Sequence, residues 1–438
     1  MSDRVVGSIA AALVIFAAAV PPAAAQTAEP TLAPAPVPIP VPIERVTFEE
    51  AIRRALERNP TVGQSAQAVL RAQALLDQAR SVFRPTITAT AGTTVLDEAR
   101  GFDGNITQPR TQAAFGGVAS FPVLAATRWA QARQASDQVG IARLSAEETR
   151  RQVALLAAVS YLAVLLSEHQ LEIAGRNLET GRALEEYARA RLEAGQGSRL
   201  NHVRSSQERA AAEGLTQAAG LAVRQAQEAL GIAIFADGPV DADGEPRIDA
   251  IAPAPVEEGW LAARPDVRLF AAQVAAADRI VRDTWKSWLP TATAAFSPQY
   301  VTPSGFFEPA STWRAFVQLQ VPIYDGSLGA TRRLRIADRE TAQLRLDAVR
   351  SEARAEVRFA QESVTRNQQI VASSREAAES AREALRITEV AYKAGATTNV
   401  EVVQAQQTAR NAEVQAALAE DRLRQARLDL LVAMGRFP

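Results

Sequence analysis

The side chains that most often carry catalysis or bind metals are scarce in this chain. Among its 438 residues there is no cysteine, which excludes disulfides, thiolate metal sites and a cysteine nucleophile. The two histidines, His169 and His202, are 33 positions apart on different expected helices, so we expect core or solvated side chains rather than a metal pair. We recognise no paired carboxylates in a plausible cleft, glycine-rich phosphate loop or nucleophile elbow. The sequence therefore predicts neither an enzyme nor a bound cofactor.

The charge balance and the N-terminus narrow the class of protein further. Lys and Arg number 48 against 49 Asp and Glu, which argues against a nucleic-acid binder. Residues 1–25 predict a cleaved export signal, in which Arg4 precedes an apolar stretch and Ala23–Ala25 form a small-residue cleavage site. The proline-rich residues 26–43 predict an extended linker. The later apolar run 153–166 has only 14 residues, so we expect a buried helix rather than a membrane span.

The rest of the chain repeats one pattern. Pro122 precedes Gly195 by 73 residues, and Pro322 precedes Gly395 by the same 73 residues. Around these glycines, the segments RLEAGQGSRLNHVRSSQ and AYKAGATTNVEVVQAQQ align at an offset of 200. We therefore expect two copies of one structural unit, at 44–236 and 258–438, joined by a Gly- and Pro-rich linker at 237–257.

Each unit is expected to run helix, strand pair, long helix, turn and helix. The strand pairs are predicted at 85–122 and 290–322, the long helices at 125–194 and 327–394, and the last helices at 198–231 and 398–434. The second long helix would measure about 100 Å, with Ser327 as its cap and Gly395 at its end. Steps of three and four residues give it a coiled-coil seam of mostly small side chains, from Val357, Ala360, Val364, Asn367, Val371, Ser374, Ala378, Ala381, Leu385 and Thr388 to Tyr392.

The strand pairs alternate between apolar and polar residues. Ile87, Ala89 and Ala91 share one face of the first strand, and Trp313, Ala315, Val317, Leu319 and Val321 share one face of the last. Nine or ten residues of such alternation suit a transmembrane β-strand, but a soluble hairpin with one wet face has the same pattern. The export signal and the lack of a predicted membrane helix favour the barrel.

Two hairpins supply four strands, which cannot close a barrel alone, and open edges are not tolerated in lipid. If the strands enter a membrane, several chains must share one barrel. Each chain would add two long helical hairpins on the side opposite the loops 97–110 and 302–311. Such a pore continued by a helical tube is a conduit.

At this level of detail the chain resembles the TolC-like outer-membrane efflux protein family. The resemblance rests on the duplicated plan, on Pro-Ile-Tyr-Asp-Gly-Ser at 322–327 and on Tyr-Lys-Ala-Gly-Ala-Thr-Thr-Asn-Val-Glu at 392–401, and it covers nearly all of 44–438. It implies a homotrimer whose twelve strands form one barrel in outer-membrane lipid, continued by an α-helical barrel through the periplasm. It also implies docking to a periplasmic adaptor (membrane fusion) protein and an inner-membrane transporter, in an efflux pump or a type I secretion system. In the first copy Phe121-Pro122-Val123-Leu124 departs from this pattern, because it lacks the Asp-Gly of the second copy.

The resemblance places gating and adaptor contacts at the periplasmic turns. These are Ala194-Gly195-Gln196 and Ala394-Gly395-Ala396; left-handed caps at the two glycines would explain part of their role. The positions that match the family's acidic aperture are Leu200, Asn201, Glu401 and Gln404, and Thr397 stands at the nearby basic position. Glu401 alone is acidic, so one carboxylate per chain would line the constriction and favour cations. The alternative is a first-turn glutamate that stabilises its own helix by about 0.3–1 kcal/mol.

A different class of protein fits the same helices. A soluble periplasmic coiled-coil scaffold or adaptor-like protein would use the strand pairs as a small β domain. The two hypotheses differ at 85–122 and 290–322, because only the channel needs lipid-facing apolar stripes.

Overall fold

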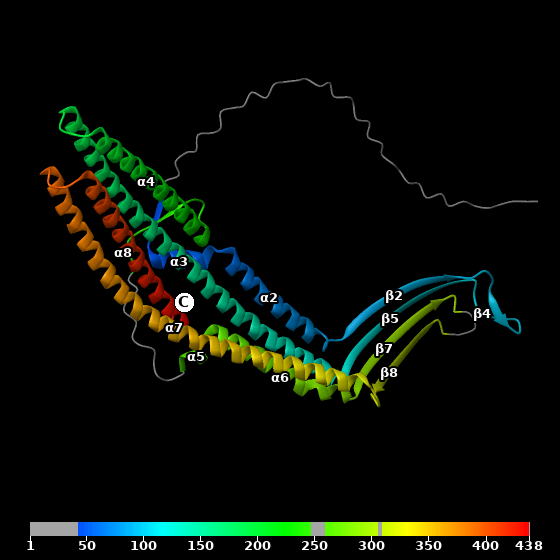
Figure 1. Cartoon of the computed structure of the whole chain (residues 1–438). Helices are drawn as coiled ribbons and strands as arrows, with labels where there is room; N and C mark the ends of the chain where they lie inside the picture. The colour runs from blue at the N-terminus through cyan, green and yellow to red at the C-terminus, as the bar shows by residue number, and fades with distance from the viewer. Residues whose placement is uncertain (1–42, 247–258, 305–308, 438) are drawn as a thin grey trace, which may run out of the picture. The chain divides into compact units, whose positions relative to one another are not determined.

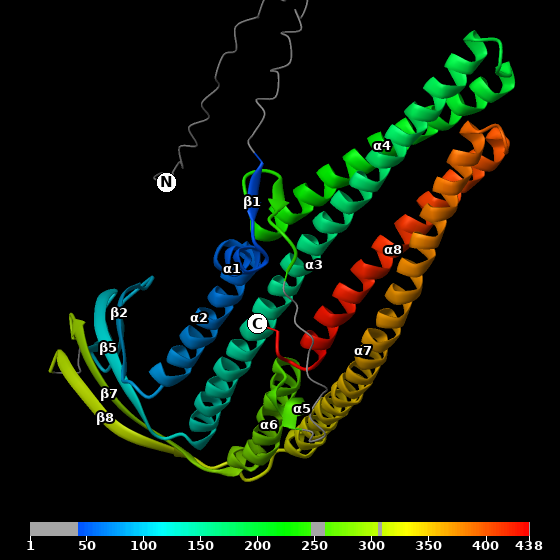
Figure 2. The same ribbon diagram turned by 90° about the vertical axis from the view of Figure 1, so that its left-hand side faces the viewer.

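The computed structural model describes residues 43–246, 259–304 and 309–437. The predicted signal at 1–25, nearly all of the linker at 26–43 and most of the segment 237–257 lie outside these residues. Figures 1 and 2 show the described part as long paired helices with a sheet at one end of them, and that sheet has four strands. This mainly helical fold with its sheet confirms the expected fold class.

Each repeat contributes a short helix, a medium helix, two long strands and a hairpin of long helices. In the first repeat they are α1 (Phe48–Arg58), α2 (Pro60–Ser81), β2 (Thr86–Val95), β5 (Thr111–Leu124), α3 (Ala126–Glu193) and α4 (Arg199–Ile234). In the second they are α5 (Gly259–Ala263), α6 (Pro265–Asp283) with the 3-10 turn η1 (Thr284–Trp288), β7 (Thr291–Thr302), β8 (Ser311–Gln320), α7 (Ser327–Lys393) and α8 (Asn399–Ala433).

A proline divides the first helical segment of each repeat. Pro60 and Pro265 each start a new helix, because proline lacks the N–H that a continuing helix needs. The residue before each proline ties this break to the end of the repeat's last helix. Asn59 Nδ2 donates to the carbonyl of Ala233 at 3.1 Å, and Arg264 Nη1 donates to the carbonyl of Ala433 at 2.9 Å. The duplication thus extends to equivalent tertiary hydrogen bonds.

The long helices pack as two hairpins, α3 with α4 and α7 with α8, while α2 lies along α3 and α6 along α7 (Figure 2). A stretch of α3 is apolar enough to cross a membrane by composition, but 56% of it is buried in the fold. Its side chains fill the main core together with α1, α4 and the C-terminus, and the hydroxyl of fully buried Tyr161 donates to the carbonyl of Gly244 at 2.7 Å. The expectation that 153–166 is a buried helix is confirmed.

The seam predicted on α7 lies against its neighbours. All its members are buried or half-buried, including Val357, Ala378 and Tyr392. Arginines and glutamates on the other side of the helix are exposed, and some bridge the hairpin: Arg375 pairs with Glu420 of α8 at 2.7 Å. A heptad seam of small residues therefore sets the α7–α8 packing.

The four long strands form one antiparallel sheet in the order β2-β5-β7-β8. The two hairpins meet where β5 pairs with β7, so β2 and β8 are the edges. The register aligns Ile87, Ala119, Phe296 and Ala315 in one row across all four strands.

Some local expectations need correction. Ser327 does not cap α7; it is the first helical residue, and its N–H donates to the Asp325 carboxylate at 2.8 Å. In the first copy, which lacks this Asp-Gly, β5 simply continues through Pro122 to Leu124 with an irregularity in its pairing. Two small sheets were also not expected: β1 (Glu44–Val46) pairs in parallel with β6 (Val240–Ala242), and β3 (Arg100–Phe102) pairs with β4 (Asn105–Gln108) within the first loop.

Candidate functional site

The sheet has one apolar face and one polar face. Every second row of the sheet, counted from the row of Ile87, Ala119, Phe296 and Ala315, lies on the same face. The residues of these rows are mostly apolar; they include Ala89, Ala91, Phe115, Phe121, Ala294, Pro298, Tyr300, Trp313, Val317 and Leu319. The intervening rows are mostly polar and carry Thr86, Thr88, Thr90, Gln112, Ser120, Thr293, Ser297, Gln299, Thr312, Arg314, Gln318 and Gln320, together with Val118, Ala295, Val301 and Phe316. Alternation within each strand was visible in the sequence, whereas the register shows that all four apolar stripes lie on the same face.

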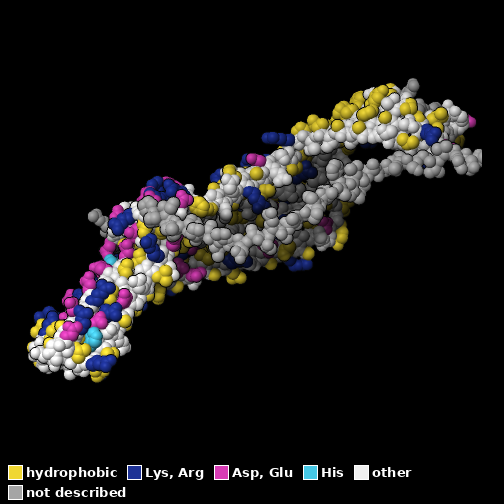
Figure 3. Space-filling model, turned by 90° about the horizontal axis from the view of Figure 1, so that it is seen from above, with side chains coloured by type: hydrophobic (Ala, Val, Ile, Leu, Met, Phe, Trp, Pro, Cys, Tyr) yellow, Lys and Arg dark blue, Asp and Glu magenta, His cyan; other side chains and the backbone are white. Residues whose placement is uncertain are grey.

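This apolar face is exposed within the chain. Ile87 is 77% exposed, Trp313 72% and Val317 69%. Figure 3 shows hydrophobic side chains gathered over the strands, whereas charged side chains gather over the helices. A soluble β domain would cover such a face, so a continuous exposed apolar stripe on every strand favours contact with lipid.

Aromatic side chains mark both ends of the apolar face. Tyr300 and Trp313 lie near the loops, while Trp129 and Trp288 lie where the strands join the helices. Trp288 and Tyr300 are twelve residues apart, or about 30 Å across a bilayer for strands tilted by about 40°. Since the hydrocarbon core is about 30 Å thick, the aromatic residues have the spacing of two interfacial girdles.

The predicted tip turns have the same geometry in both repeats. Gly195 has φ +72° and Gly395 has φ +76°, in the left-handed region. In the second turn Gly395 N donates to Tyr392 O at 3.0 Å and Ala396 N to Ala391 O at 2.8 Å; in the first, Gly195 N donates to Leu192 O at 3.0 Å and Gln196 N to Arg191 O at 2.9 Å. Each is a Schellman cap. Ala194, Gly195, Gln196, Ala394, Gly395 and Ala396 are all exposed, so these turns present a free surface within the chain.

Side chains join the two helical hairpins just behind the tips. The Tyr187 and Tyr392 rings meet edge to face at 5.5 Å, beside buried Val402. Buried Asn399 Nδ2 donates to Ser205 Oγ at 3.0 Å, and Arg410 pairs with Glu208 at 3.1 Å. Sequence reasoning did not select these residues. The alignment at an offset of 200 showed that the two turn segments are equivalent in the repeats, but it did not show which side chains would touch.

The positions predicted to form the aperture lie at the starts of α4 and α8. Leu200, Glu401 and Gln404 are exposed, and Asn201 is half-buried. The Glu401 carboxylate accepts a hydrogen bond from the Thr397 hydroxyl, and the N-cap Thr398 hydroxyl lies 3.4 Å away. The Glu401 N–H in turn donates to Thr398 Oγ1 at 3.5 Å, which places Glu401 at the third helical position of a capping arrangement. Glu401 therefore takes part in the N-terminal cap of α8 and is also exposed to solvent.

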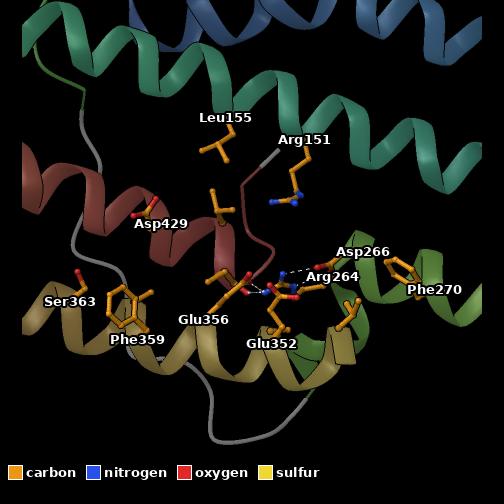
Figure 4. A pocket seen from close by; sticks show the side chains of 15 residues that line it. Arg151, Leu155, Arg264, Asp266, Phe270, Glu352, Glu356, Phe359, Ser363 and Asp429 are labelled. Carbon is orange, nitrogen blue, oxygen red and sulfur yellow. Dashed lines mark hydrogen bonds and ion pairs between the residues drawn. The ribbon is translucent and has the colours of Figure 1, made fainter. Parts of the chain in front are cut away.

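A cavity of about 650 Å³ lies away from both predicted sites, among α3, α6, α7 and α8. Figure 4 shows Arg264 at its wall, held by Asp266 and Glu356. The buried guanidinium of Arg264 pairs with Asp266 at 2.7 Å and with Glu356 at 2.8 Å. It also donates a hydrogen bond to the Ala433 carbonyl. Burial of Arg264 would lower the guanidinium's pKa, but these carboxylates keep its pKa raised. Arg264 is thus a structural tie rather than a free cationic site.

One carboxyl pair escaped the sequence analysis. Glu168 of α3 and Asp241 of β6 meet at the small parallel sheet; burial, and then Asp241, raise the pKa of Glu168 to about 7. Burial opposes ionisation of Asp241, but hydrogen bonds from Gln227 and Glu168 and the charge of Arg45 hold its pKa below the usual value. Asp241 is buried and accepts a hydrogen bond from Gln227 Nε2 at 3.0 Å, so its carboxylate is held in place within the packing of β6.

With this geometry in view, the comparison with known families is decisive. The family model described as outer membrane efflux protein matches residues 51–234 and 259–436, one segment in each repeat. The chain belongs to the outer membrane efflux protein family. This efflux protein is an outer-membrane exit duct, with its strands in the outer membrane and its helices in the periplasm.

Solved structures share the fold over nearly the whole efflux protein. The outer membrane protein VceC from Vibrio cholerae matches with a TM-score of 0.76 at 16% identity, over 89% of this chain and 96% of that one. The Campylobacter jejuni CmeC outer membrane channel matches with a TM-score of 0.79 at 14% identity, over 89% and 86%. The open state of the Neisseria gonorrhoeae MtrE outer membrane channel matches with a TM-score of 0.76 at 20% identity, over 89% and 88%. No curated protein sequence matches significantly.

The family assignment also decides between the two hypotheses drawn from the sequence. The apolar face of β2-β5-β7-β8 contacts lipid in an outer-membrane efflux channel, whereas a soluble scaffold would leave it unexplained.

Proposed function

We propose that three copies of this chain build one duct that carries solutes from an inner-membrane transporter to the cell exterior. The observation that carries the proposal is a sheet with an exposed apolar face and two open edges, β2 and β8. Unpaired backbone groups at such edges cost several kcal/mol each in lipid, so β8 of one copy must pair with β2 of the next. Three copies close twelve strands, and the long helices continue the barrel into the periplasm.

The tip turns supply the proposed contact with partners. Ala194, Gly195 and Gln196 with Ala394, Gly395 and Ala396 form the surface that docks a periplasmic adaptor protein, which links the duct to the transporter. The duct itself has no energy source, so transport is driven by that partner. A tripartite efflux pump and a type I secretion system both fit this role, and the choice of cargo lies with the transporter.

The assembly is tested by the location and mass of the mature protein. Membranes are fractionated, the protein is extracted in mild detergent, and light scattering gives the protein mass of the particle. We expect an outer-membrane particle of three chains. A water-soluble monomer or dimer contradicts the proposal, because the strands would then form an ordinary soluble domain.

A second proposal concerns the aperture. Because Glu401 is exposed and is the one acidic residue among the predicted aperture positions, three copies place three negative charges around the constriction. Glu401→Gln should lower the preference of the channel for K⁺ over Cl⁻ in single-channel recordings, since the amide keeps the size and removes the charge. Gln404→Glu, one turn further along α8, should raise that preference. If both variants keep the wild-type ratio, Glu401 acts only as a helix cap.

A further inference from the structure

The barrel strands carry a single charged residue. Across β2, β5, β7 and β8, all of which the structure describes, Arg314 is the one residue that is Asp, Glu, Lys or Arg. It lies fourth from the start of β8, on the polar face, opposite Ser297 of β7. In a transmembrane barrel with an apolar outer surface, this polar face lines the lumen.

The Arg314 side chain stays on that face. Its Cζ atom lies 5.2 Å from the centroid of the Phe316 ring, two residues along the same strand. A guanidinium over an aromatic ring is held by a cation–π contact, which leaves its charge in place. The contact restrains the group within the lumen rather than beside the lipid.

The strands supply no carboxylate that would neutralise this charge. The neighbour of Arg314 within the chain is β7, and the strand that pairs with the other edge of β8 in the assembled barrel is β2; neither contains an acidic residue. Among the described residues no ion pair involves Arg314. Three copies therefore place three positive charges at one level, with no acidic residue on the strands beside them.

The lumen is narrow enough for these charges to act together. Twelve strands about 4.8 Å apart and tilted by about 40° give a circumference of about 75 Å and a backbone radius of about 12 Å. The side chain projects inward from that wall, so a solute on the axis lies within about one Debye length, about 8 Å in physiological salt, of all three guanidinium groups.

We propose that Arg314 makes the membrane barrel of this efflux channel select anionic over cationic solutes. The proposal rests on the trimeric duct proposed above and adds the charge class of the solutes that its outer half favours. Arg314 acts at the opposite end of the duct from Glu401, so the two effects can be measured separately.

The effect of the Arg314 charge on the lumen is tested first, because this experiment does not require the periplasmic end of the duct to be open. The chain has no cysteine, so Ser297→Cys provides one thiol opposite Arg314. In intact outer membranes we compare its reaction rates with an anionic sulfonate reagent and a cationic trimethylammonium reagent. Adding Arg314→Gln should lower the anionic-to-cationic rate ratio about fivefold, while Arg314→Lys keeps it. Arg100→Gln, in the outer loop, is the matched control and should leave the ratio unchanged.

The facing of the strand is checked by Val317→Cys, which should resist both water-soluble reagents because Val317 lies on the apolar face near the middle of the membrane strand. Reversal potentials of the purified channel in a KCl gradient then report selectivity, and Arg314→Gln should shift the ratio toward K⁺ by a similar factor. A trimer whose rate ratio is unaffected by Arg314→Gln overturns this inference alone. A soluble particle without a barrel overturns the proposed function, and this inference with it.

Discussion

Replacing Val317 with arginine should prevent the protein from assembling in the outer membrane. Val317 lies on the apolar face of β8 and is 69% exposed within the chain, which makes it a lipid-facing position. An arginine near the middle of a membrane strand costs about 2–4 kcal/mol, and three copies raise the cost to about 6–12 kcal/mol per barrel. We expect loss of the detergent-extracted trimer and of outer-membrane protein in fractionated cells.

The adjacent residue provides the matched control. Gln318→Arg adds the same side chain one position along β8, on the polar face, where water in the lumen solvates it. It should assemble at the wild-type level. Equal assembly of both variants, or equal loss, would show that the two faces do not meet different solvents and would contradict a lipid-exposed sheet.

Much of this fold was predictable because its signals are local. The alternation of Trp313, Arg314 and Ala315 along one strand, and the three-four steps from Val357 to Tyr392, are properties of consecutive residues. Duplication strengthened the prediction of the element order, since the same plan occurs twice at a nearly constant offset. The described elements therefore follow the expected order, with their ends shifted by only a few residues.

What escaped prediction depends on contacts between distant segments. The sheet order and register pair β5 with β7, from Ala113 with Thr302 to Leu124 with Ala292, and no local pattern determines which rows align across such a separation. For the same reason the tie from Asn399 to Ser205 and the Glu168–Asp241 pair were missed. The strands β1 and β6 have three residues each, too short for any alternation to be visible.

Some of the candidate site could likewise be predicted from local sequence, and some of it could not. The glycines of the tip turns could be identified from sequence, since a left-handed residue after a long helix strongly favours glycine. Whether Glu401 lines an aperture could not be read from one chain, because an aperture is formed by several copies. The single chain shows instead its hydrogen bonds to Thr397 and its helix N-terminus.

Replacing Gly395 or Gly195 with valine should abolish export. Both glycines have φ near +70°, where a non-glycine residue costs about 1–2 kcal/mol and a β-branched one more. Valine would therefore break the Schellman bonds from Gly395 N to Tyr392 O and from Ala396 N to Ala391 O, and distort the turn. Export is measured with the partner transporter expressed, at a protein level shown by immunoblot to match wild type.

Asparagine at the same positions separates backbone conformation from docking. Asparagine adopts the left-handed conformation far more readily than valine, and a Cβ at either glycine meets no atom of the chain within 4 Å. Gly395→Asn should therefore keep the turn folded. If the glycines matter only as caps, Gly395→Asn exports normally; if the adaptor approaches the bare backbone, it assembles as a trimer but fails to export. Because docking is proposed at these turns, we expect the second result, and normal export by Gly195→Asn and Gly395→Asn together would confine the glycines to a capping role.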